Sequence, residues 1–126
     1  MPSFTERKRK AGCKARTRGS IAETLAVVWL WLTGYRIRAR RFKTALGEVD
    51  IVVQRAGVTI GIEVKKRASL VLAVESITPR VRQRLQRALA CYVGQQKIPD
   101  GSDMRVDAFC FGAWYRFRHV KNLSLG

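Results

Sequence analysis

Apolar residues recur along the chain in two spacings, and the helical spacing comes first. We expect a helix to begin at Ser20, where Ser20 and Glu23 form a capping box, and to run through "IAETLAVVWLWLT" until Gly34 ends it. This helix is apolar on nearly every side, so it should pack against a sheet and leave apolar surface for a second subunit in a homodimer. Core packing should account for at least one of Trp29 and Trp31.

The segments that follow alternate between apolar and polar residues, as strands do. In "YRIRARRF" we expect Tyr35, Ile37 and Ala39 to face the core, while the arginines between them face the other way. "GEVDIVVQRAGVTIGIEVKK" contains two strand-like runs around a turn, "MRVDAFCF" predicts a fourth strand, and "WYRFRHV" predicts an edge strand. A second helix should begin at Thr78, with Pro79 at its first position.

This order of elements, αβββαβ, predicts an α/β fold with a mixed central sheet flanked by helices. The 126 residues suffice for one domain with a single core. Residues 1–18 carry a dense basic run with almost no apolar periodicity. We therefore expect a flexible basic arm there, followed by a single domain over residues 19–126.

Neither a membrane span nor a disulfide framework is expected. The most apolar stretch, residues 24–35, is shorter than the roughly 20 residues that cross a bilayer, and the basic N-terminus lacks the apolar segment of a secretory signal. Cys13, Cys91 and Cys110 show no CxxC spacing and are interpreted as reduced thiols, while the lone His119 offers no zinc set. The chain is expected to be cytoplasmic.

The charge balance narrows the class of partner. Lys and Arg number 25 against 9 Asp and Glu, which gives a net charge of +16. Such a charge repels itself in a compact protein, and a polyanionic partner is its usual explanation. Nucleic acid is therefore the expected partner, ahead of an acidic protein. No membrane association is expected, because neither helix pairs a basic face with a lipid-facing aromatic one.

Two acids interrupt the apolar runs of the hairpin. If the loop consists of Ala56 and Gly57, then Asp50 and Glu63 lie directly opposite each other on one face, with Cβ atoms roughly 4.5–5.5 Å apart. Lys65 shares that face. A divalent cation would remove the repulsion between the acids, and Mg²⁺ is typically held by one or two carboxylates, so the set favours metal-assisted phosphodiester hydrolysis. The geometry equally allows the two acids simply to pair with arginines on an exposed face.

The hairpin motifs resemble a known nuclease signature. "GEVDIVV" followed by "IEVKKR" is similar to the D…(D/E)xK pattern of the PD-(D/E)xK nuclease superfamily, whose core is also αβββαβ, the restriction-endonuclease-like fold. Together with "GSIAE", "GYRIRARRF", "ITPRVRQRL" and "RVDAF", in that order, these motifs resemble the bacterial UPF0102 (YraN-like) family of predicted endonucleases, related to archaeal Holliday junction resolvases. The resemblance runs from about Gly19 to the C-terminus.

The resemblance implies roles for individual residues. Asp50 and Glu63 match the metal-binding acids, Lys65 matches the catalytic lysine, and Glu23 matches the acid of the first helix, a further metal-site residue. The backbone carbonyl of Val64 would complete the set of ligands around Mg²⁺ or Mn²⁺.

Three further positions bear on the match. Glu48 corresponds to the first acid of the family's "GE-D" stretch, but we expect its position in the strand to turn it away from Asp50 and give it a lesser role. Lys66 stands where a threonine is usual, and Val81 stands where a lysine is common.

The leading hypothesis is a metal-dependent endonuclease acting on structured or branched DNA. The alternative is a non-catalytic nucleic-acid-binding protein that keeps the nuclease fold, and a role on RNA also stays open, with DNA favoured. Contacts to phosphates position a substrate without reading its bases. The cations expected to make such contacts are Arg36, Arg38, Arg40, Arg41, Lys66, Arg67, Arg80, Arg84 and Arg87.

Overall fold

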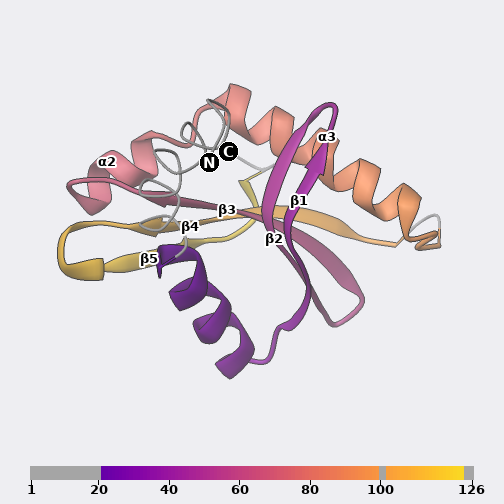
Figure 1. Cartoon of the computed structure of the whole chain (residues 1–126), viewed down its shortest axis with the longest axis horizontal. Helices are drawn as coiled ribbons and strands as arrows, with labels where there is room; N and C mark the ends of the chain where they lie inside the picture. Colours follow the sequence, from indigo (N-terminus) through magenta and orange to yellow (C-terminus); the bar gives the residue numbers. More distant parts are fainter. Residues whose placement is uncertain (1–20, 100–101, 124–126) are drawn as a thin grey trace, which may run out of the picture.

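The computed structural model describes residues 21–99 and 102–123, which form a five-stranded mixed sheet with helices on both faces (Figure 1). A helix over residues 21–32 comes first. The elements that follow it are β1 (Arg36–Thr44), β2 (Gly47–Arg55), β3 (Val58–Lys66), α2 (Leu70–Glu75), α3 (Pro79–Gln95), β4 (Met104–Phe111), the short 3-10 helix η1 (Ala113–Tyr115) and β5 (Phe117–Val120).

The strands lie in the order in which they occur in the chain, from β1 to β5. All neighbours are antiparallel except β3 and β4, which run parallel and are joined by the crossover that contains α2 and α3. The predicted α/β fold with its αβββαβ core is therefore confirmed, as is the edge strand. Helix α2 was not predicted. The basic arm expected for residues 1–18 lies outside the described residues.

The first helix packs on one face of the sheet. It buries Ala22, Ala26 and Leu30 completely against strand residues of β2, β3 and β4. Gly34 follows it with a φ of +95°, a conformation that favours glycine and ends the helix as predicted. The helix also exposes several large apolar residues, so the expected homodimer stays a prediction. They are Ile21, Leu25, Val28, Trp29, Trp31 and Leu32.

The expectation that the core holds Trp29 or Trp31 is wrong. Trp31 is 67% exposed, and Trp29 is 43% exposed although its ring meets the edge of Phe117 with centroids 4.9 Å apart. The small residues of the helix, which let it lie close to the sheet, take the buried positions instead.

The opposite face of the sheet is covered by α3 and α2 (Figure 1). Thr78 caps α3 as predicted, since its hydroxyl accepts a hydrogen bond from the Val81 amide at 3.2 Å. Leu85 and Leu89 of α3 are buried against Val49 and other residues of the sheet. No helix among residues 21–99 and 102–123 combines the length and apolar character that crossing a bilayer requires.

The alternation predicted for the first strand is wrong at its centre. The register between β1 and β2 shifts between Ile37 and Ala39, which makes Arg38 the extra residue of a bulge. As a result Ile37 packs on the face of the first helix, whereas Ala39 packs on the face of α3. Arg36, Arg38, Arg40 and Arg41 are all exposed, but the bulge prevents them from forming a single cationic face.

Candidate active site

The hairpin of β2 and β3 has the predicted two-residue loop. Arg55 pairs with Val58, and the intervening Ala56 and Gly57 have φ values of 50° and 78°, as a tight hairpin turn requires. The same register continues to the pair of Ile51 and Ile62. The next pair of positions in this register is Asp50 and Glu63, so the structure brings the two predicted acids together.

The backbone pairing of β2 and β3 ends at these two acids. Instead of a backbone carbonyl, the Oδ2 atom of Asp50 accepts a hydrogen bond from the Val64 amide at 2.8 Å. The side chain of Asp50 thus stands between the strands where they separate. Val64 itself packs toward the first helix.

Glu63 is nearly buried and already has a cationic partner. Its residue exposure is 9%, and its Oε1 lies 3.1 Å from the Nζ of Lys65. Because residues two apart in a strand share a face, this contact follows from the alternation of β3. Glu63 also shares that face with Gly61, against which Leu89 of α3 packs.

Asp50 and Glu63 line a cavity of about 470 Å³. The other residues around it come from β1, β2, the turn between them and α3. They are Lys43, Thr44, Gly47, Glu48 and Arg84. The cavity is therefore acidic at its base and is bordered by two cations.

The position expected for Glu48 is wrong. Glu48 lines the same cavity as Asp50 and contributes to the electrostatic environment of its carboxyl group. The reason is the period of the strand, since positions 48 and 50 are two apart and share a face. Glu48 is thus a third acid of the site, and the sequence contained the signal that identifies it.

The environment of Asp50 opposes its ionisation. Burial and the charge of Glu63 raise its pKa from 3.8 to about 7, with smaller contributions from Glu23 and Glu48 in the same direction. The hydrogen bond from the Val64 amide opposes this rise. A positive charge placed at the carboxylates would lower the pKa of Asp50 again, because it favours the ionised form.

Glu23 of the first helix also faces this region. It is 6% exposed, its Oε1 lies 3.5 Å from the Nε of Arg40, and its Oε2 lies 3.4 Å from the Nε of Arg41. Its Oε1 is buried without a hydrogen-bond partner in the described part of the chain. Ser20, its expected partner in a capping box, lies outside the described residues. The structure thus places Glu23 near Asp50, with an acceptor atom to spare.

The carboxylates fit a hard cation, although they are not gathered around one point. Within residues 21–99 and 102–123, no group of three or more His, Cys, Asp or Glu residues lies close enough to hold a metal ion. Instead, Glu63 forms an ion pair with Lys65, and Glu23 forms ion pairs with Arg40 and Arg41. The raised pKa of Asp50 and the Oε1 of Glu23, which makes no hydrogen bond although the Nε of Arg40 lies 3.5 Å from it, fit a binding site for Mg²⁺, which needs only one or two carboxylates and waters.

The predicted phosphate-binding cations divide into three groups. Arg84 lines the acidic cavity, and Lys66 and Arg67 continue β3 directly beyond Lys65. Arg80 and Arg87 are exposed on α3 but do not line the cavity. The arginines of β1 lie on the other side of the acids, where two of them pair with Glu23.

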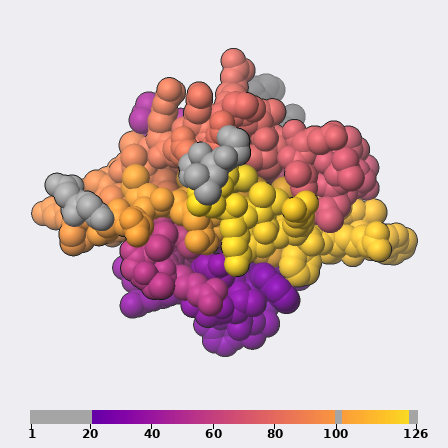
Figure 2. All heavy atoms as spheres, turned by 180° about the vertical axis from the view of Figure 1, so that it is seen from behind, coloured from indigo at the N-terminus to yellow at the C-terminus, as the bar shows by residue number. Residues whose placement is uncertain are grey.

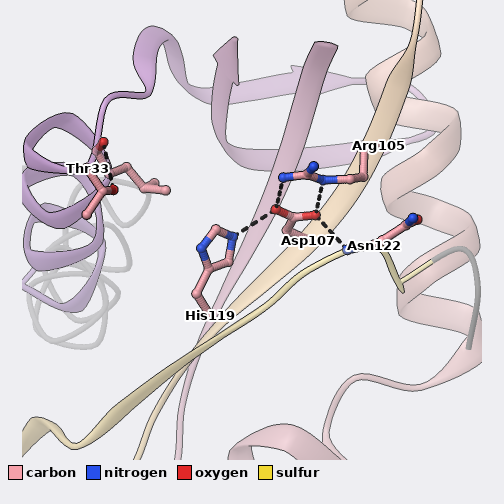
Figure 3. A network of polar contacts seen from close by, with 6 residues as sticks. Thr33, Arg105, Asp107, His119 and Asn122 are labelled. Carbon is pink, nitrogen blue, oxygen red and sulfur yellow. Dashed lines mark hydrogen bonds and ion pairs between the residues drawn. The ribbon is translucent and has the colours of Figure 1, made fainter. Parts of the chain in front are cut away.

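A second polar cluster lies away from the cavity (Figure 3). Asp107 of β4 is fully buried and accepts two hydrogen bonds from the guanidinium of Arg105, at 2.9 and 3.1 Å. Its carboxylate also bonds the Nε2 of His119 at 2.8 Å and the amide of Asn122 at 2.9 Å. Burial alone would raise the pKa of Asp107, but these hydrogen bonds outweigh it and lower the pKa. The cluster joins β4, β5 and the segment after β5, and it accounts for the lone histidine.

Comparison with known proteins places this geometry in a family. A model described as "Uncharacterised protein family UPF0102" matches residues 22–111. The chain belongs to the UPF0102 family. The UPF0102 protein of Caulobacter sp. (strain K31) is 39% identical over 121 residues, which cover 96% of this chain and 87% of that protein. UPF0102 protein mlr4633 of Mesorhizobium japonicum is 36% identical over 123 residues, which cover 98% of both.

The UPF0102 match includes the whole candidate site. Residues 22–111 contain Glu23, Glu48, Asp50, Glu63 and Lys65, and they extend to the end of β4. β5 and η1 follow the matched region.

Proposed function

We propose that this UPF0102 protein is a metal-dependent endonuclease that hydrolyses phosphodiester bonds in structured or branched DNA. The observation that supports this most is the pair formed by Asp50 and Glu63, which lies with Lys65 at an acidic cavity in a chain of net charge +16. Two neighbouring acids at a cavity, one of them with a raised pKa, are the kind of arrangement that functional sites use.

Asp50 and Glu63 are the residues that would hold Mg²⁺ or Mn²⁺, together with the backbone carbonyl of Val64. Glu23 would contribute through its Oε1 atom, which makes no hydrogen bond. The cation would polarise a phosphoryl oxygen and lower the pKa of a bound water. Lys65 places its Nζ beside Glu63, from which it can orient the attacking water or offset the charge that develops on the phosphate.

The surrounding cations would hold the substrate through its phosphates. Such contacts depend on charge and not on sequence, so they suit recognition of the shape of a nucleic acid. Arg84 has the best position among the arginines of α3, because it reaches the cavity that the acids line.

Replacing Arg84, which lines the cavity, should impair cleavage more than replacing Arg87, which does not line it. A charge-assisted hydrogen bond is worth about 1.5–3 kcal/mol, so Arg84→Ala should reduce kcat/KM for cleavage by roughly 10- to 100-fold. Arg87→Ala removes the same charge from the same helix at an exposed position away from the cavity, and we expect less than about a threefold effect. Equal losses in the two variants would mean that α3 contributes only a general positive field.

A cleavage assay tests the proposed activity directly. Linear duplex, flapped and four-way junction DNA, and RNA of matched sequence, would be incubated with the wild type in Mg²⁺, in Mn²⁺ and in EDTA. We expect cleavage with either metal and none in EDTA, with the branched substrates cut faster than the linear duplex. Absence of cleavage of every substrate in both metals would refute the endonuclease proposal.

The second candidate function is nucleic-acid binding without catalysis. One observation favours it, namely that Glu63 and Glu23 each already have cationic partners within the chain. In that case the affinity for nucleic acid should be unchanged by Mg²⁺ and by Asp50→Asn. A metal-linked affinity that Asp50→Asn abolishes would exclude it.

A further inference from the structure

The turn between β4 and β5 carries an indole ring that lies almost wholly in solvent. Trp114 is 96% exposed, the highest value for any large apolar residue in the described ranges. Figure 2 shows the gold segment that joins these two strands protruding from the edge of the molecule. Tryptophan is highly buried on average, so this exposure requires a physical reason.

The backbone that presents this ring is strained. Trp114 and Tyr115 have φ values of 57° and 55°, in the left-handed region that favours glycine. A non-glycine residue in that region is sterically strained, and such residues cluster at active sites and ligand-binding positions. The conformation must therefore be imposed by the surroundings of the turn.

The start of the turn is fixed by backbone contacts. The amide of Gly112 donates a hydrogen bond to the carbonyl of Arg116 at 2.7 Å, which closes the loop around Trp114. Gly112 also lies directly against the backbone of Leu70 at the start of α2, where a Cβ atom would collide. These contacts hold the start of the turn against α2 and close it with a backbone hydrogen bond.

The end of the turn is fixed by side chains. The ring of Tyr115 meets the edge of Phe111 with centroids 6.0 Å apart, and the Nζ of Lys66 lies 4.7 Å from the centre of the same tyrosine ring. Trp114 is thus held between two anchored neighbours while its own ring is uncovered. The backbone on either side of the ring is therefore fixed before a ligand covers it.

The surface around the turn is cationic. The adjoining stretches of chain, residues 64–74 and 108–123, contain lysines and arginines but no aspartate or glutamate. Lys65, Arg67 and Arg118 all lie within electrostatic range of the thiol of Cys110, which shows that they converge on the end of β4. An uncovered aromatic ring in such a surface suits a ligand that has both flat faces and negative charge.

The turn lies at the same end of the sheet as the acids. β3 and β4 are parallel, with Glu63 opposite Ala108 and Lys66 opposite Phe111. The three residues from Glu63 to Lys66 span about 10 Å of strand. A nucleic acid whose backbone passes the acids can therefore reach the turn by following the cations of β3.

We propose that Trp114 is a stacking platform for an unpaired base in the nucleic acid bound at Asp50 and Glu63. This inference rests on the proposed function and adds a substrate class to it, namely nucleic acid with a single-stranded segment next to the scissile phosphodiester. An unpaired base exposes its face to an indole, whereas a base within a duplex is already stacked on its neighbours. The platform would explain both the exposure of Trp114 and the strain of its backbone.

Binding measurements in EDTA test this inference separately from catalysis. Fluorescence anisotropy would give the Kd of a labelled oligo(dT) single strand and of a blunt duplex of equal length, at one fixed salt concentration. The proteins compared would be the wild type, Trp114→Ala, Trp114→Phe and the control Trp31→Ala, which removes an exposed indole from the first helix. The side chain of Trp114 packs on little of the protein, so its variants should fold, and thermal unfolding would check this.

Stacking of one base on an aromatic ring contributes about 1–3 kcal/mol, so Trp114→Ala should weaken single-strand binding by roughly 5- to 150-fold. Duplex binding should change by less than about twofold, Trp31→Ala should have no effect, and Trp114→Phe should restore most of the affinity. An equal change on both DNAs, or none on either, would overturn the inference while the endonuclease proposal stands.

Two other results would have a different meaning. Failure of the wild type to bind either DNA in EDTA would overturn this inference, whereas the proposed function is decided separately by the cleavage assay in Mg²⁺ and Mn²⁺. Binding to anionic phospholipid vesicles that Trp114→Ala abolishes, with single-strand binding unchanged, would overturn the inference and assign the ring to a membrane surface.

Discussion

Asp50→Asn should abolish metal-dependent cleavage and at the same time stabilise the protein in EDTA at alkaline pH. The loss of cleavage should be roughly 10³-fold or more, because a bound metal ion supplies several kcal/mol of transition-state stabilisation and the amide is a poor ligand for Mg²⁺. The gain in stability has a separate cause, namely the repulsion that Asp50 experiences from Glu63 and its other acidic neighbours.

The sign of the pH dependence follows from the raised pKa of Asp50. The folded protein holds a proton on this carboxyl up to about pH 7, whereas the unfolded chain releases it near pH 3.8. The folded state therefore binds more protons between these values, and the stability of the wild type falls as the pH rises through this window. Asparagine has no proton to lose, and its side-chain oxygen can still accept the hydrogen bond from the Val64 amide.

Chemical unfolding in EDTA at several pH values measures this effect. After allowance for partial solvation of the site, the free energy of unfolding of Asp50→Asn should exceed that of the wild type by about 1–3 kcal/mol near pH 8. The difference should shrink as the pH falls through this window and vanish below about pH 3.8, where Asp50 is protonated in both the folded and the unfolded state. Asp103→Asn is the control, because it removes an acid of the same type from an exposed position. If Asp50→Asn is instead the less stable protein near pH 8, the acid pair is a structural feature.

Local patterns in the sequence were sufficient to predict the hairpin of β2 and β3 and the face on which its acids lie. The two-residue loop fixed the register of β2 and β3, and the period of two then placed Asp50, Glu63 and Lys65 on one face. The same rule, applied to Glu48, would also have placed it in the cavity. These relations hold over a few residues, and no bulge interrupts the paired positions of β2 and β3.

Other features depend on residues that are distant in sequence. The bulge at Arg38 arises from the pairing of β1 with β2, and the residues of "YRIRARRF" do not predict it. Helix α2 is a six-residue apolar run, which periodicity cannot distinguish from a strand. The exposure of Trp114 accompanies positive φ values at Trp114 and Tyr115, which the types of residue around it do not predict.

The role of Asp107 also depends on residues that are distant in sequence. Of the substitutions considered, its replacement should cause the largest loss in the free energy of unfolding. The acid interrupts an apolar strand, as Asp50 does, but its partners Arg105, His119 and Asn122 come from β4, β5 and the segment beyond. We expect Asp107→Asn to reduce the free energy of unfolding by about 3–5 kcal/mol, the usual cost of removing one partner from a buried ion pair. The new amide group would also point a donor at groups that themselves donate.

Thermal and urea unfolding at neutral pH would measure the loss, with Asp103→Asn again as the exposed control. Because its hydrogen bonds hold the pKa of Asp107 below the ordinary value of 3.8, the stability that it provides is complete above that pH. It is lost as the pH falls through the lower pKa of the folded state, so the difference between wild type and variant should shrink in strong acid. A loss below about 1 kcal/mol at neutral pH, which is typical of an exposed ion pair, would mean that the cluster does not secure β5 to the sheet.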